Sequence, residues 1–204
     1  QLVAEFRHPL GPEVELVDMT DPKAVQAAIV PGSTRLVWIE TPANPTWTIT
    51  DIAATAEIAH AAGAILAVGS TVATPVLTRP LDLGADIVMH AATKYLNGHS
   101  DLIAGVLVAR ENNALWQSIR TVRAQVGGTL GSFEAWLLMR GMRTLFLRVR
   151  AASASAQRVA EYFHGRPLVA EVLYPGLPTA RGDAVAARQM QGGFGGMLSI
   201  RARG

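Results

Sequence analysis

Lys94 stands within the chemically most informative segment of this sequence, His90–Asp101 (HAATKYLNGHSD). An apolar run, Asp86–Met89, precedes it and is typical of a buried strand, whereas Asn97–Ser100 has the composition of a turn. A lysine amine at the end of a buried strand loses its proton readily and can then attack a carbonyl carbon. On spacing alone, a solvated or phosphate-binding lysine is the commoner case. The segment therefore indicates a nucleophilic lysine, with an ordinary surface lysine as the alternative.

The composition is typical of a compact globular protein and excludes several functions. The chain has 204 residues, of which 50% are hydrophobic and 17% charged, and its net charge is +2. Because the sequence contains no cysteine, disulfides and cysteine-based metal sites are excluded. The five histidines show no ligand spacing, so we expect no metal. The basic cluster has helical spacing, which favours an exposed or subunit-facing helix over a nucleic-acid site; its members are Arg140, Arg143, Arg148 and Arg150.

The sequence predicts no membrane contact. No apolar run approaches the ~20 residues that cross a bilayer. The N-terminal residues do not have the basic and then apolar pattern of a secretory signal. We therefore expect a cytoplasmic protein. Because the first residue is Gln1, we also expect the chain to be a piece of a longer polypeptide.

Strands alternate with helices over the first half of the chain, which predicts an α/β fold with a mainly parallel sheet. Asp51 and Gly63 have the residue types of a helix N-cap and a helix end. The predicted strands are Val14–Met19, Arg35–Glu40, Ala64–Val68, Asp86–Ala91 and Ile103–Ala109, and the predicted helices are Asp21–Ile29 and the segment from Asp51 to Gly63.

The pattern changes after Gly127. Ser132 is expected to cap a long helical segment that runs to about His164, with a bend at Gly141. The sequence then predicts a strand within Arg166–Tyr174, a turn at Pro175–Pro178, a helix at Gly182–Gln191 and a strand at Met197–Ala202. We expect 1–131 to be part of a large domain, 132–165 a long interdomain helix, and 166–204 the start of a second, incomplete α+β domain.

Six segments occur in one order over essentially the whole chain: Glu40–Thr46, Ala73–Pro75, Arg79–Asp86, Ala92–Asp101, Phe133–Arg148 and Arg188–Ser199. Together they resemble the transsulfuration enzymes of cysteine and methionine metabolism, which depend on pyridoxal 5′-phosphate (PLP): cystathionine γ-synthase, the cystathionine lyases, methionine γ-lyase and the homoserine sulfhydrylases. The resemblance implies a fold-type-I enzyme, α/β, whose mainly parallel central sheet is flanked by helices and binds PLP.

The resemblance assigns roles to four residues of this chain. Lys94 matches the lysine that holds PLP as a Schiff base and then moves protons between substrate carbons. Thr93 matches a hydroxyl that contacts the phosphate, and Thr71 matches a threonine of the cofactor site. Asn44 matches an amide that bonds the phenolic oxygen of the ring, although its loop alone indicates only a turn-forming asparagine.

Two positions depart from the family pattern. Ala91 stands where the family commonly has a serine of the phosphate site. Gly69 stands where the family has the aspartate that keeps the pyridine nitrogen protonated. Because neighbouring hydroxyls donate only neutral hydrogen bonds, we expect PLP binding with weak carbanion chemistry, and a sharp rise in turnover for Gly69→Asp. Asp86 and Asp101 are possible substitutes only where the fold brings them close.

The resemblance implies PLP-dependent α,γ- or α,β-elimination or replacement on a small amino-acid substrate, namely a sulfur amino acid or an O-activated homoserine, most similar to the reaction of cystathionine γ-synthase. The family implies a homo-oligomer, a dimer of dimers, of which this chain would be about the middle half. The alternative is a catalytically impaired remnant or structural subunit of the same fold. A generic nucleotide-binding module is disfavoured because no Gly-x-Gly-x-x-Gly follows the first strand. The cluster Gly192–Gly196 is interpreted as a turn.

Overall fold

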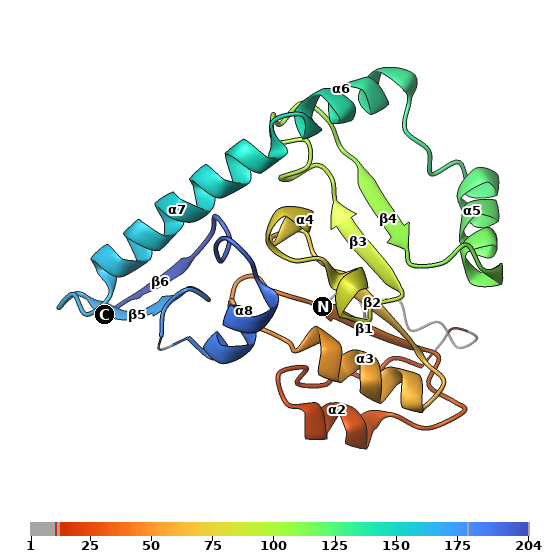
Figure 1. The fold of residues 1–204 in the computed structure, drawn as a ribbon, viewed down its shortest axis with the longest axis horizontal. Coiled ribbons are helices and arrows are strands. Elements are labelled where there is room, and N and C mark those ends of the chain that lie inside the picture. Colours follow the sequence, from red (N-terminus) through yellow and green to blue (C-terminus); the bar gives the residue numbers. More distant parts are fainter. Residues whose placement is uncertain (1–10, 12, 179, 204) are drawn as a thin grey trace.

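A four-stranded sheet forms the centre of the larger part of the molecule, and a two-stranded sheet lies beside the long helix α7 (Figure 1). The structure is a computed structural model that describes residues 11, 13–178 and 180–203. The strand order of the large sheet is β1-β2-β3-β4. These strands are β1 (Leu36–Glu40), β2 (Ile65–Gly69), β3 (Ile87–Ala91) and β4 (Gly105–Ala109).

Strands β1, β2 and β3 are parallel, and β4 closes the series as an antiparallel neighbour of β3. In this register Glu40 pairs with Gly69, and Gly69 pairs with Met89. The carboxyl ends of β1, β2 and β3 therefore meet at one edge of the sheet, where loops of α/β proteins commonly bind ligands. This arrangement confirms the predicted α/β class with a mainly parallel sheet.

Helix α3 (Ile52–Ala61) packs against one face of the large sheet, and α2 (Pro22–Ala28) packs against α3. Asp51 caps α3 as predicted, because its carboxylate accepts a hydrogen bond from the amide of Ala54 at 3.2 Å. Alternate residues of the strands point to this face and are buried there. They are Val37 and Ile39 of β1, Leu66 and Val68 of β2, and Val88 of β3.

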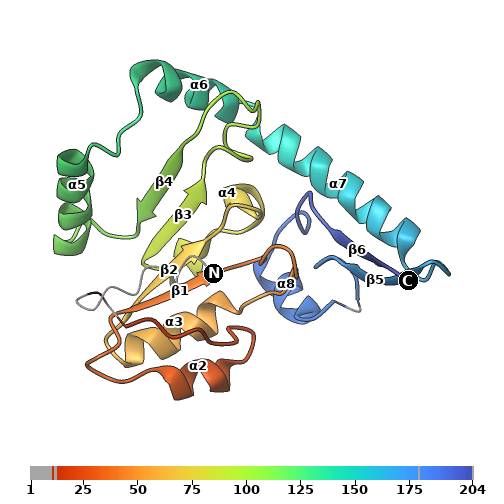
Figure 2. The same cartoon turned by 180° about the vertical axis from the view of Figure 1, so that it is seen from behind.

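The rest of the chain runs along one side of the sheet and ends in the small sheet. Figure 2 shows, from behind, that α6 (Ser132–Met142) and α7 (Leu145–Phe163) pass from the tip of β3 to the small sheet. That sheet consists of β5 (Val169–Leu173) and β6 (Ser199–Ala202), which are antiparallel. The remaining elements are α4 (Thr74–Leu77), the 3-10 helix η1 (Pro80–Leu83), α5 (Ala114–Val126) and α8 (Asp183–Gln189).

Three expectations about elements were wrong. Val14–Met19 is not a strand but an irregular segment that leads into the turn before α2. Ser132 is the first residue of α6 rather than its cap; Gly131 takes that position, and no side chain caps the helix. The predicted single helix is two helices, and α5 was not predicted at all. The division into domains at residues 131 and 165 stays a prediction.

Candidate active site

The residues that the sequence singled out lie in the loops that follow β1, β2 and β3. Asn44 follows β1, Thr71 follows β2, and Thr93 and Lys94 follow β3. Parallel pairing brings these loops to one edge of the sheet. In Figure 1 the arrowhead of β3 points toward the junction of α6 and α7, so this edge lies beneath that junction.

Lys94 lies in a tight turn directly after β3 and is exposed. Its amide donates to the Ala91 carbonyl at 3.0 Å, and its own carbonyl accepts from the Gly98 amide at 2.7 Å. Among the described residues, nothing forms a hydrogen bond or an ion pair with the side-chain amine. The turn therefore fixes the backbone of Lys94 and leaves its amine free to react.

Helices α6 and α7 hold this turn through direct contacts with its backbone. The Arg148 guanidinium of α7 donates to the Tyr95 carbonyl at 2.9 Å and to the Gly141 carbonyl at 2.9 Å. Gly141 of α6 is buried against the Asn97 carbonyl, with which an added Cβ would overlap. The sequence indicated a bend at Gly141, whereas the structure shows that a side chain does not fit there.

Gly141→Ala is expected to lower the free energy of unfolding by about 2–3 kcal/mol, as overpacking against rigid backbone does. The better helix propensity of alanine offsets only part of this cost. Gly128→Ala is the matched control, because no atom lies within 4 Å of its added Cβ. Denaturant unfolding of both variants checks the prediction, and equal stability of the two would contradict it.

The Asn44 loop is held by a hydrogen bond within the loop and by contacts with β6, and Asn44 is exposed. Within the loop, the Trp47 amide donates to the Ala43 carbonyl at 2.6 Å. The Trp47 indole donates to the Ser199 hydroxyl of β6 at 2.6 Å, and that hydroxyl donates to the Pro45 carbonyl at 3.0 Å. The loop beside the site is thus joined to the small sheet.

The two threonines of the site already bind the neighbouring backbone. Thr71 Oγ1 accepts from the Ala91 amide at 2.9 Å, which ties the end of β3 to the loop after β2. Thr93 Oγ1 accepts from the Ala104 amide at 2.9 Å and donates to the Ala104 carbonyl at 3.3 Å. Both hydroxyls position the Lys94 turn in this structure. The phosphate contact expected of Thr93 stays a prediction.

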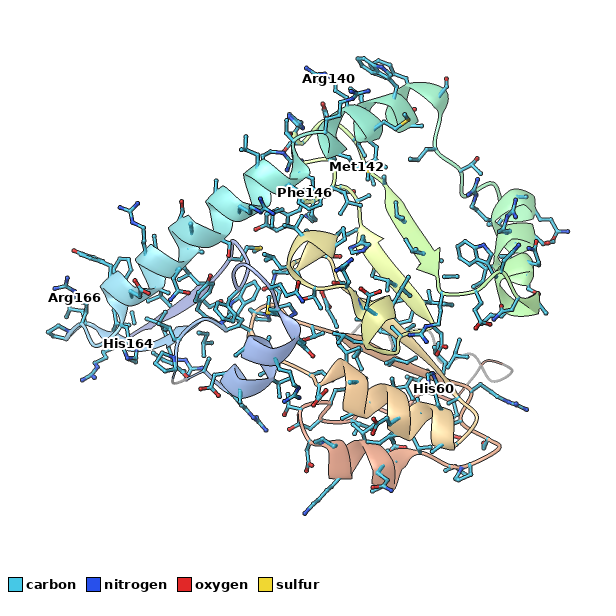
Figure 3. All side chains as sticks on the ribbon, in the orientation of Figure 1. His60, Arg140, Met142, Phe146, His164 and Arg166 are labelled. Atoms are coloured by element: carbon cyan, nitrogen blue, oxygen red, sulfur yellow. The ribbon has the colours of Figure 1, made fainter. Side chains whose placement is uncertain are left out.

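Neither acid considered as a substitute for the missing aspartate reaches Gly69. Asp86 precedes β3 at the opposite edge of the sheet, where it bonds the Leu66 amide at 2.8 Å and His60 at 2.9 Å. Figure 3 labels His60 on α3, far from Met142 and Phe146 at the α6–α7 junction. Asp101 accepts from the Asn97 side chain at 2.8 Å.

Glu40 is the acid that the fold brings to Gly69, and the sequence did not indicate it. Its Cγ lies 3.5 Å from the position that a Cβ on Gly69 would occupy. Glu40 is exposed in part, yet the loss of water around its carboxyl group raises its pKa above the ordinary value.

His90 lies near the end of β3 and is buried. Its Nδ1 donates to the Ser70 carbonyl at 3.1 Å, and burial lowers the pKa of its imidazole.

A residue with strained backbone follows each of the three parallel strands. The residues Trp47, Thr74 and Ser100 have φ angles of 56°, 56° and 58°, in the left-handed region that side-chain-bearing residues rarely adopt. One of them follows each of β1, β2 and β3. Such strain concentrates at functional sites, which independently marks this edge of the sheet.

The glycine cluster Gly192–Gly196 does more than turn the chain. Ser153 Oγ of α7 accepts hydrogen bonds from the Phe194 and Gly195 amides at 3.0 and 3.2 Å. A Cβ on Gly196 would lie 2.6 Å from the hydroxyl of Tyr95, the residue that directly follows Lys94. Glycine is required here because the segment passes closely over both α7 and the Lys94 turn.

The donors at this edge fit the functional groups of PLP. A free lysine amine matches its aldehyde, the exposed Asn44 amide matches its phenolic oxygen, and the Glu40 carboxylate matches a protonated ring nitrogen. The Thr71 and Thr93 hydroxyls at this edge are of the type that can bind a phosphate, although in this structure both bond neighbouring backbone groups. No group of metal-binding side chains occurs in the described residues.

A family described as Cys/Met metabolism PLP-dependent enzyme matches residues 1–204. The cystathionine gamma-synthase of Mycobacterium tuberculosis is 47% identical over 187 residues, which cover 92% of this chain and 47% of that protein. The L-methionine gamma-lyase of Porphyromonas gingivalis is 46% identical over 88% of this chain and 45% of its own. The chain thus spans about half the length of the curated relatives it matches.

A solved structure has the same fold at high similarity. The methionine gamma lyase of Micromonospora echinospora superposes with a TM-score of 0.90 at 38% identity, over 94% of this chain and 52% of that chain. This agreement places the sheet, the long helix and the Lys94 turn in a known architecture. Within the residues described, no helix is long and apolar enough to cross a membrane.

Proposed function

Because this chain belongs to the family of Cys/Met metabolism PLP-dependent enzymes, we propose that it is part of an enzyme of sulfur amino-acid metabolism. The reaction is an α,γ- or α,β-elimination or replacement on a sulfur amino acid or an O-activated homoserine, most similar to that of cystathionine γ-synthase. The observation that carries the proposal is the Lys94 amine at the carboxyl edge of the sheet, with which no described residue forms a hydrogen bond or an ion pair.

The proposed site assigns one task to each residue. Lys94 binds the cofactor and later removes the hydrogen from the α-carbon of the substrate. When bound, PLP withdraws electrons from that carbon and so acidifies its hydrogen. Asn44 holds the phenolic oxygen of the ring, while Thr93 and Thr71 support the phosphate end and the Lys94 turn. Arg148 keeps the turn in place through its carbonyl contacts.

The same proposal includes the setting of the intact protein. We infer a cytoplasmic homo-oligomer, a dimer of dimers, in which residues 1–131 form part of the large domain. Residues 132–165 then form the interdomain helix, and 166–204 begin the second domain. The relatives named cystathionine gamma-synthase support the synthase reaction over the lyase reaction.

Borohydride reduction in the presence of PLP tests the proposal, because it converts a cofactor–lysine linkage into a stable secondary amine. The chain contains two lysines, Lys94 and Lys23, so peptide mass mapping assigns the label without ambiguity. We expect the label on Lys94. Labelling of Lys23 in α2 to the same extent, or of neither lysine, would overturn the proposal.

A second candidate function is favoured by Gly69 alone: a subunit that keeps the fold and has lost the chemistry. Such a subunit would carry the borohydride label at Lys94 but would not exchange the α-hydrogen of a bound amino acid with solvent. Measuring label and exchange on the same preparation separates the two candidates.

A further inference from the structure

The side chain of Glu40 occupies the space beside the missing side chain of Gly69. The two residues are register partners on adjacent parallel strands, so their side-chain positions lie on the same face of the sheet. Glu40 Cγ and Cβ lie 3.5 and 3.6 Å from the Cβ position of Gly69, in ordinary van der Waals contact. Glutamate is one methylene longer than aspartate. Its carboxylate can therefore reach the region that an aspartate on β2 would serve.

We propose that Glu40 supplies from β1 the carboxylate that relatives place on β2, and that it accepts a hydrogen bond from the protonated ring nitrogen of the cofactor. This inference rests on the proposed function. Glu40 belongs to the segment Glu40–Thr46 that resembles the family, so we infer a new task for an existing acid: β2 has Gly69 where relatives have aspartate, and Glu40 on the adjacent strand serves the ring nitrogen in its place.

The surroundings of Glu40 favour this role. No described residue forms a hydrogen bond or an ion pair with its carboxylate, so it is not used elsewhere in the fold. Partial desolvation disfavours the charged form of the Glu40 carboxyl group and so raises its pKa. A cationic ring N–H beside it would remove that disadvantage. Asp86 and Asp101, in contrast, already have partners.

The experiment compares the affinity of this chain for PLP with its affinity for 1-deaza-PLP, in which a C–H group replaces the ring nitrogen. The unmodified chain should bind PLP at least about tenfold more tightly, as expected for one charge-assisted hydrogen bond. Glu40→Leu should remove the preference and Glu40→Gln should reduce it. Glu57→Gln is the matched control, because Glu57 is exposed on α3 and faces away from the site edge.

The outcomes separate this inference from the proposed function. Binding of both compounds with the same preference in the Glu40 variants and in the unmodified chain would overturn the role of Glu40 and leave the proposed function standing. Binding of both compounds with equal affinity by the unmodified chain would do the same. Failure to bind either compound would overturn the proposed function and this inference together.

Discussion

Lys94→Ala is expected to lower the rate at which a bound amino acid exchanges its α-hydrogen with solvent by about 10³-fold, the usual contribution of a general base. The reason is positional: among the described residues, the amine on the turn after β3 is the one lysine at this edge of the sheet. The measurement is loss of the α-proton signal by NMR in heavy water, with PLP present.

Lys23→Ala provides the control, since it removes the other lysine from an exposed position on α2. Its exchange rate should equal that of the unmodified chain. Addition of a small primary amine should restore part of the exchange in Lys94→Ala, because free amine can then accept the proton. Undiminished exchange in Lys94→Ala would show that another group removes the hydrogen.

In a Glu40→Gln background, Gly69→Asp is expected to raise the same exchange rate by about 100-fold. An electrostatic contact that stabilises the charge formed during a reaction typically has an effect of this size. The backbone accepts the change, because a Cβ on Gly69 meets no atom closer than 3.5 Å. In the unmodified background the gain should be much smaller. There Glu40 already supplies a charge, and two adjacent carboxylates disfavour each other's ionisation.

Gly69→Asn in the Glu40→Gln background separates charge from size. Asparagine fills the same space without a carboxylate, so the rate should stay near that of Glu40→Gln alone. A similar gain from asparagine would mean that packing, rather than a carboxylate near the ring nitrogen, limits the reaction. A large gain from Gly69→Asp in the unmodified chain would instead support the weak carbanion chemistry expected from the sequence.

The sequence predicted the parts of this fold whose signals are local. Asp51 begins α3 with a hydrogen bond three residues away, and an apolar run, Ala64–Val68, gives β2 almost to the residue. The strand and turn around Lys94 indicated a nucleophilic lysine, and the family resemblance added its role toward PLP. Even the position of the site follows from local reasoning, because loops after successive parallel strands must meet at one edge.

What the sequence did not predict depends on contacts between distant segments. Glu40 and Gly69 are 29 residues apart, and only strand register brings them together. Arg148 reaches the Tyr95 carbonyl across 53 residues, so its charge resembled that of an ordinary helix surface. Val14–Met19 has the pattern of a strand yet is irregular in the structure, because local pattern alone does not determine secondary structure. Each miss is a tertiary effect that overrides a local preference.

The hydroxyl of Ser199 has a mechanical consequence. Because it bonds both Trp47 and Pro45, a rigid-body shift of the β5–β6 ribbon must carry the Asn44 loop with it. The Asn44 amide, for which we propose a bond to the phenolic oxygen of PLP, therefore moves with a strand about 150 positions later in the chain. A movement of the small sheet would thus change the absorption spectrum of PLP bound beside the Asn44 loop.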